Sequence, residues 1–224
     1  MIRLVAGKGV GGTSVNENDQ PILMLEPGVT ISNLIIGSPA AKGIWCKGSC
    51  TLQNVWWESV GTHAAGFGTH PQYWANVNNK YIVQGGGARN AADKMFIQQG
   101  AGTTIFNNFY ALDASKLFQS CGDCPNNNVI RKRHLIINSS TFQGPGLSIA
   151  GMNSNFGDTI SYNGLQLCNS ASIKYTCQGY EGNTNYDNAN GVNFMQAPIE
   201  KMKVGQALNG VACNDPHAKI VIAN

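Results

Sequence analysis

The sequence is poor in charge. Asp, Glu, Lys and Arg together make up 12% of its 224 residues, where roughly a quarter is usual. The net charge is +3, and the fifteen Lys and Arg residues are scattered apart from the run 131–133. Because nucleic acids bind to dense basic patches, this charge pattern predicts no nucleic-acid partner.

Long apolar runs are also missing. No stretch approaches the eighteen or so apolar residues of a membrane span, so we expect no membrane insertion. The opening MIRLVAGKGVGG lacks the apolar core of a signal peptide, so a secreted protein would be represented here by a mature or trimmed form. Capped segments with an apolar stripe of helical period are absent too, and the one short helix that we expect lies at 198–208.

Glycine and asparagine are plentiful instead. There are 27 Gly residues, and Asn gathers in stretches such as NVNNK and NYDNANG, a composition that favours turns and strands. A chain of this length can bury one core, and nothing in it demands a second. We expect one all-β domain over 1–224, with 180–224 as a loop-rich closing segment.

One short pattern recurs along the chain: an amide side chain interrupts a β-prone run of period two, as in TISNLII and TLQNVWW. The amides lie 21 to 30 residues apart, about the length of one coil of a parallel β-helix. An amide at the same station of every coil could hydrogen-bond to its neighbours above and below, forming a ladder. The six amides of this ladder would be Asn33, Asn54, Gln84, Asn108, Asn138 and Asn163.

A parallel β-helix is therefore the predicted fold. The alternative is that Asn is simply common in β-turns and that the chain forms a β-sandwich. Sandwich strands usually recur every 8 to 12 residues, which matches the observed intervals less well.

The seven cysteines favour disulfides. Cys121 and Cys124 form a CxxC, which is also half of a zinc site, but zinc needs a second ligand pair and the sequence has only four histidines. Short spacings beside Gly-rich turns indicate local disulfides in an oxidising compartment, with one thiol left over. The spacing groups the cysteines as Cys46/Cys50, Cys121/Cys124, Cys168/Cys177 and a lone Cys213.

Five segments between about 21 and 142 are distinctive: LEPGVTISNLIIG, GIWCKGSCTLQNVWWE, GGGARNAADKMF, SKLFQSCGDC and KRH. In this order they resemble the polysaccharide lyase family 3 pectate lyases, and CQGYEGN near Cys177 is a further match. The resemblance implies a secreted, right-handed parallel β-helix that cleaves de-esterified homogalacturonan by β-elimination with calcium.

That chemistry needs positive charge and a base. Calcium and basic side chains neutralise the uronate, and the base removes its C5 proton. The resemblance places Lys94 (in DKMF) and Lys116 (in KLFQSCGDC) along the groove, and Arg133 and His134 as a basic pair. Arg133 would hold a carboxylate through two contacts, and His134 would titrate near neutrality. Without the motifs, each would be taken for an ordinary surface or packing residue.

The sequence departs from the family where the chemistry is most demanding. Gln119 stands in place of the arginine that the family usually has as its base, and an amide cannot take a proton. Lys42, Thr62 and His63 stand in place of the calcium carboxylates. Because an ammonium group repels calcium, which needs several oxygen ligands, we expect no metal cofactor. A more distant carboxylate, Glu58, Asp93 or Asp113, could still supply a metal ligand, and Asp93, beside Lys94, is the best candidate of the three.

These losses have two interpretations. In the first, the fold persists without the chemistry, and the protein is an impaired homologue that binds an acidic polysaccharide or acts as an extracellular interaction or assembly module. An exposed end of the β-helix would then allow self-association. In the second, Lys42 and a charged His63 replace calcium, and the protein is an active polyuronate lyase whose base is His63, His134 or a lysine of lowered pKa.

Aromatic residues crowd the first third of the chain, and sugar rings stack on aromatic faces. Trp56 and Trp57 are adjacent, so within a strand one points inward and the other outward. The loop 68–79 carries Tyr73 and Trp74, which would cover the groove or contact another protein.

Overall fold

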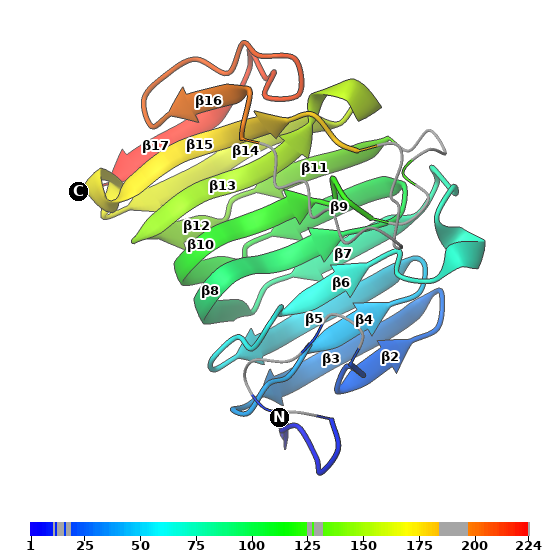
Figure 1. The fold of residues 1–224 in the computed structure, drawn as a ribbon. Helices are drawn as coiled ribbons and strands as arrows, with labels where there is room; N and C mark the ends of the chain where they lie inside the picture. The colour runs from blue at the N-terminus through cyan, green and yellow to red at the C-terminus, as the bar shows by residue number, and fades with distance from the viewer. Residues whose placement is uncertain are drawn as a thin grey trace.

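The computed structural model describes residues 1–10, 12, 16, 19–124, 127, 132–183 and 197–223. Its strands stack in parallel into a right-handed β-helix, with the N-terminal coil at one end and the C-terminal strands at the other (Figure 1). The predicted fold is confirmed. No helix among the described residues is long and apolar enough to cross a bilayer.

Each coil passes through three faces of the β-helix, and several strands bend from one face into the next. Face 1 comprises the first parts of β3 (Val29–Ile36) and β5 (Cys50–Trp57), then β7 (Lys80–Gln84), β9 (Gly102–Asn107), β11 (Arg133–Asn138) and the first part of β14 (Thr159–Cys168).

Face 2 comprises β1 (Ile2–Leu4), the second parts of β3, β5 and β14, the first parts of β8 (Gly87–Gln98) and β10 (Tyr110–Ser120), β12 (Thr141–Gln143) and β17 (Lys219–Ala223). Face 3 comprises β2 (Leu23–Leu25), β4 (Ile44–Cys46), β6 (Ala65–Phe67), the second parts of β8 and β10, β13 (Gly146–Asn153) and β15 (Ile173–Tyr180). The 3-10 helices are η1 (Pro71–Tyr73), η2 (Ser154–Phe156) and η3 (Ser170–Ser172).

The core lies between the three faces and is filled by alternate residues of the strands, as the period of two predicts. Its centre is aromatic: the Phe96 ring lies 5.6 Å from Trp57, 4.8 Å from Phe106 and 5.4 Å from Phe109, between ring centroids. Trp57 is 1% exposed whereas Trp56 is 41% exposed, so the expected inward and outward alternation of this pair is confirmed.

The amide ladder exists, but in two pieces. In the first, Asn54 Nδ2 donates to Asn33 Oδ1 over 2.8 Å. Both residues occupy a left-handed corner between faces 1 and 2, with φ of 51° and 56°. The second piece uses the residue before that corner, with amide-to-amide distances of 3.0, 2.8 and 3.0 Å, and runs through Gln84, Asn107, Asn138 and Asn163.

Asn108 is therefore wrongly placed in the predicted ladder. It occupies the corner, with φ 52°, where its coil neighbours are Gly85 and Ser139. Its predecessor Asn107 is in register with Gln84, and so takes the ladder position. The predicted ladder was defined by residue type alone, and it therefore combined two adjacent positions of the coil, the corner and the residue before it.

Two of the three cysteine groupings are confirmed as disulfides, Cys46–Cys50 and Cys121–Cys124. The third grouping is wrong, because Cys177 pairs with Cys213 and leaves Cys168 as the free thiol. Cys168 lies on face 2, where β14 pairs with β12 and β17, whereas Cys177 lies on face 3 and is buried.

The closing segment contains strands where a helix was expected. Instead of a helix at 198–208, β16 (Glu200–Lys203) pairs antiparallel with β15. The Glu200 carboxylate accepts hydrogen bonds from the backbone N–H groups of Val211, Ala212 and Cys213 over 3.0, 3.3 and 3.2 Å. Because β16 is extended, the Glu200 side chain points towards the loop that carries Cys213 and its disulfide.

We expect Asn138→Ala to lower the free energy of unfolding by about 2 kcal/mol, because Asn138 makes two ladder bonds and each contributes about 1 kcal/mol. Asn163→Ala, at the end of the ladder, should cost about half as much. Urea unfolding followed by circular dichroism measures both variants. Equal costs for the two substitutions would contradict the ladder.

Thiol titration provides a second test of the fold. Denatured but unreduced protein should release one thiol per chain, that of Cys168, and Cys168→Ser should remove it. Cys213→Ser should add one thiol and lower stability, because the lost disulfide spans 36 residues of chain. A thiol count that falls instead of rising in Cys213→Ser would show that Cys177 and Cys213 are not paired.

Candidate functional site

Lys94 and Lys116 lie side by side on face 3. They are register partners in the pairing of β8 with β10. The pairing shifts just before them, since three steps from Ala91 to Lys94 match two steps from Ala114 to Lys116. Such a bulge redirects side chains, and it leaves Asp93 exposed with its carboxylate 2.5 Å from Lys94 Nζ.

Lys116 is the more enclosed of the two lysines. Its Nζ donates to Gln119 Oε1 over 2.9 Å and lies 5.1 Å from the centroid of the Tyr180 ring. Desolvation by burial lowers the pKa of Lys116; the Asp93 carboxylate opposes this shift, and the Lys94 ammonium adds to it. Two ammonium groups, those of Lys94 and Lys116, therefore lie close to one carboxylate, that of Asp93.

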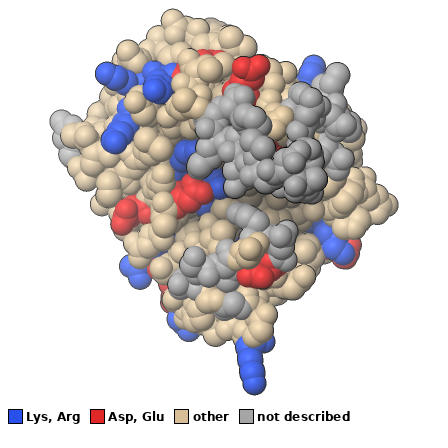
Figure 2. Space-filling view, in the orientation of Figure 1, with Lys and Arg blue, Asp and Glu red and all other residues tan. Residues whose placement is uncertain are grey.

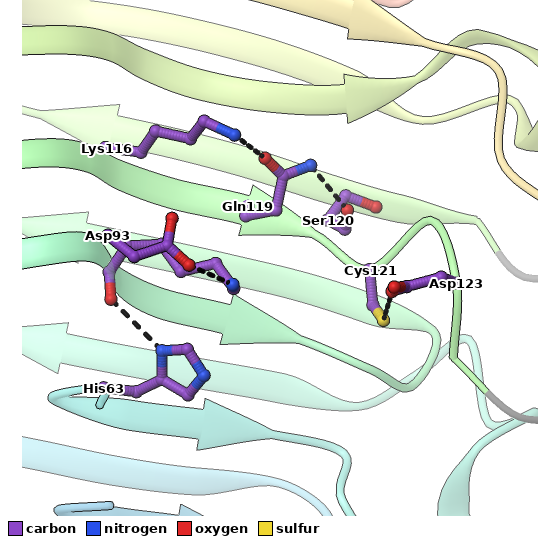
Figure 3. Close-up of polar contacts among 8 residues, drawn as sticks. His63, Asp93, Lys116, Gln119, Ser120, Cys121 and Asp123 are labelled. Atoms are coloured by element: carbon purple, nitrogen blue, oxygen red, sulfur yellow. Dashed lines mark hydrogen bonds and ion pairs between the residues drawn. The ribbon is translucent and has the colours of Figure 1, made fainter. Parts of the chain in front are cut away.

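Gln119 is held in a defined orientation. Its Nε2 donates to the Ser120 carbonyl oxygen over 2.9 Å while its Oε1 accepts from Lys116, as Figure 3 shows. The next coil has Gly151 at the register position, where a Cβ would lie only 2.3 Å from Gln119 Oε1. The amide thus lies flat on the strand and turns its oxygen towards the lysine.

Tyr180 completes this cluster, and the sequence analysis did not single it out. Its hydroxyl donates to Gln178 Oε1 over 3.2 Å, and burial, with the Asp93 charge, raises its pKa to about 12. Both residues come from CQGYEGN, so the signal was present in a segment that carried the resemblance but no assigned role. We call Asp93, Lys94, Lys116, Gln119 and Tyr180 the face 3 cluster.

Lys42 and His63 lie below this surface. Lys42 is 3% exposed, and its Nζ lies 3.7 Å from the centroid of the Trp45 ring. His63 is 1% exposed, and its Nδ1 donates to the Lys94 carbonyl oxygen over 3.2 Å (Figure 3). His63 therefore supports the strand that carries Lys94. Thr62 is half-buried, and its N–H donates to the Ala41 carbonyl oxygen over 2.9 Å.

These residues do not fit a calcium ion. Within the described part of the chain, no three His, Cys, Asp or Glu side chains come together as a metal-binding group. Calcium takes six to eight oxygen ligands, whereas the cluster offers one carboxylate, that of Asp93, already paired with Lys94. A cationic Lys42 at an expected carboxylate position repels the ion further.

Arg133 is not on the outer surface, contrary to the groove position expected for it. It is 0% exposed, and its Nη2 donates to the Gln99 carbonyl oxygen over 2.6 Å and to Asn127 Oδ1 over 2.9 Å. Its backbone N–H donates to Asp158, whose carboxylate also binds Ser120. Burial lowers the pKa of Arg133 and raises that of Asp158. The guanidinium therefore ties the end of face 3 to the start of face 1.

His134 lies on face 1, away from the lysine pair. Its Nδ1 is 2.6 Å from Thr159 Oγ1 on the next coil. The expected basic pair is thus divided between a buried network and a different face, because consecutive residues of a strand point to opposite sides.

The loop at 68–79 packs against neighbouring residues of the β-helix. The Tyr73 ring lies against Gly48, where a Cβ would be 3.2 Å from it, and 5.8 Å from the His70 ring. Tyr73 therefore packs locally, against Gly48 and His70. On the face shown in Figure 2, acidic and basic side chains lie together near the centre, and most of the described surface around them is tan, which marks uncharged residues.

Comparison with known proteins identifies the family of the chain. A family model described as pectate lyase matches residues 1–187. Probable pectate lyase D of Emericella nidulans is 34% identical over 81% of this chain, and probable pectate lyase E of Aspergillus fumigatus is 37% identical over 80%. The chain belongs to the pectate lyase family. It spans 65% and 66% of the length of these two relatives.

Solved pectate lyases share the fold. The catalytic domain of pectate lyase PelI from Erwinia chrysanthemi is 27% identical, with a TM-score of 0.72 over 99% of this chain and 95% of that one. PelI in complex with tetragalacturonic acid is 28% identical, with a TM-score of 0.70 over 99% of this chain and 67% of that one. The face 3 cluster thus lies within a family fold, on segments that the family model covers.

The electrostatics of the face 3 cluster can be tested on Lys116. Asp93→Asn should lower the pKa of Lys116 further, because it removes the charge that opposes the shift, and Lys94→Met should raise it. NMR titration of isotope-labelled dimethyl-lysine signals measures both changes, with exposed Lys219 as the control signal. Shifts of the same sign in the two variants would contradict the proposed charge arrangement.

Proposed function

We propose that this pectate lyase homologue binds an acidic, polygalacturonate-like glycan at the face 3 cluster and lacks calcium-dependent lyase activity. Lys94 and Lys116 supply two ammonium groups in register on neighbouring strands. Successive uronate carboxylates repeat along a glycan chain, so two cations one strand apart present a matching row of charge.

The orientation of Gln119 carries the proposal of impaired chemistry. Its amide binds Lys116 and the Ser120 carbonyl, so the position that the family resemblance gives to arginine holds a neutral group that cannot accept a proton. With one carboxylate in the cluster, calcium is not available to stabilise the charge that develops during β-elimination. In this proposal the protein therefore binds the glycan but does not cleave it.

The structural neighbour solved with tetragalacturonic acid supports the choice of ligand class. The three disulfides suit an oxidising compartment, so we propose that binding takes place outside the cell. The contacts of the face 3 cluster favour this role over that of an assembly module, because they concentrate charge on a small area instead of exposing an apolar interface.

One observation favours the second candidate, an active polyuronate lyase. Burial lowers the pKa of Lys116, and a lysine with a lowered pKa serves more readily as a base. Its ammonium group is engaged by Gln119, however, and the fraction of the neutral form depends on pH. Residual activity would therefore rise with pH towards the pKa of Lys116.

Affinity electrophoresis and calorimetry with polygalacturonate test the binding proposal. The Lys94→Ala, Lys116→Ala double variant should bind at least about tenfold more weakly, since each lost charge contact contributes about 1 kcal/mol. Lys80→Ala, Lys219→Ala is the matched control, because it removes the same charge from exposed lysines on faces 1 and 2. Equal losses in the two double variants would show that net charge alone governs binding.

Ultraviolet detection of the unsaturated product tests the impairment. Wild-type protein should give no more product than the Lys94→Ala, Lys116→Ala variant, with calcium or with chelator, and Gln119→Arg alone should not restore activity. Product above that background would overturn the impaired assignment. A gain on Gln119→Arg would show that the metal site has been misjudged.

A further inference from the structure

A second surface has the features of a binding site, on face 2 rather than face 3. It is a hollow of about 300 Å³ on the outer side of β5, β8 and β10. Ligand sites in proteins start at about this size and combine aromatic walls with a few polar groups. The residues that line the hollow are Trp56, Trp57, Glu58, Gly87, Ala88, Arg89, Tyr110 and Leu112.

The aromatic side chains of the hollow are held in place. Trp56 is 41% exposed, and its Nε1 donates to Asn54 Oδ1 over 2.8 Å. Its ring lies over Gly87, where a Cβ would be 2.9 Å from Cζ3, so the absence of a side chain lets the indole lie close to the strand. Tyr110, the next residue in register, donates its hydroxyl to Gln143 Oε1 over 2.6 Å.

Glu58 and Arg89 are the charged residues that line the hollow. Glu58 Oε2 accepts from Arg3 Nη2 over 2.7 Å and from Arg3 Nε over 3.0 Å, so its carboxylate is already paired. Arg89 is exposed, and its Nε donates to the Glu58 backbone carbonyl over 2.7 Å. This contact fixes the guanidinium while its terminal amino groups stay available for a carboxylate. Because Arg3 pairs with the Glu58 carboxylate, Arg89 is the lining residue that offers positive charge to a ligand.

We propose that this hollow is a second glycan site that takes one uronate unit of an acidic chain. The sugar ring stacks on Trp56 beside Tyr110, and its carboxylate binds the Arg89 guanidinium. Three side chains held by hydrogen bonds lose little freedom on binding, which favours a small ligand. A stable protein partner would bury about 800 Å² on each side, far more than this hollow offers.

The choice of an acidic glycan rests on the proposed function, but the site is separate. β5, β8 and β10 carry the hollow on face 2, and β8 and β10 reach the face 3 cluster only after turning a corner at Asn90 and Asp113, both with positive φ. A long glycan could therefore contact the β-helix on two faces.

Calorimetric titration with tetragalacturonate separates the two sites. In the Lys94→Ala, Lys116→Ala background, which disables the face 3 cluster, one binding event should persist and should change the indole fluorescence of Trp56. Adding Trp56→Ala or Arg89→Gln should weaken that event about tenfold, whereas Trp56→Phe, which keeps a ring, should weaken it less. Arg89→Gln should leave binding of the methyl-esterified tetramer unchanged, because the ester has no carboxylate.

The outcomes distinguish this inference from the proposed function. If wild-type protein binds tetragalacturonate and the lysine double variant does not, the face 2 site is refuted while the proposed function stands. If the lysine substitutions have no effect but Trp56→Ala and Arg89→Gln abolish binding, the face 2 site stands and the face 3 assignment fails. Unchanged affinity when Trp56→Ala is added to the lysine double variant, with the melting temperature as the check on folding, would overturn the inference.

Discussion

In-register pairing of parallel strands is the constraint on which the other features depend. It places each residue directly above its counterpart in the preceding coil, so that Lys116 lies beside Lys94 and Gln119 lies beside Gly151. The same pairing aligns the ladder amides at one corner and the aromatic rings in the core. A one-residue slip would turn every inward side chain outward, which the buried core does not tolerate.

This constraint separates the scaffold from the chemistry. Inward positions such as Trp57, Phe96 and Phe118 determine whether the coils stack, while outward positions are free to change as long as the backbone keeps its register. Gln119, where the resemblance predicts an arginine, is an example of the second class: its amide makes two hydrogen bonds without disturbing the core. The fold of the family therefore tolerates changes at outward positions.

The buried polar residues form a third class. Arg133, Asp158 and Ser120 stabilise the passage from face 3 to face 1, because they hydrogen-bond to one another in the interior. His63 does the same for β8 through the Lys94 carbonyl. A motif shows that such a basic residue is characteristic of the family, but it does not show whether the charge faces a ligand or the interior.

The sequence by itself determined the parallel β-helix and the local disulfides, because these follow from the spacing of amides and cysteines. The lysine pair and the departures at Lys42 and Gln119 followed from the resemblance of its motifs to a family. Its amide spacing located most of the ladder but not the station at Asn107, since two adjacent amides look alike until their register is known. Only the tertiary structure decided that Cys177 joins Cys213, that Arg133 is buried and that Trp56 and Arg89 line the same hollow. Those three features depend on contacts between residues far apart in the chain and on which side of its strand each residue faces. The local spacing of residues in the sequence predicts neither.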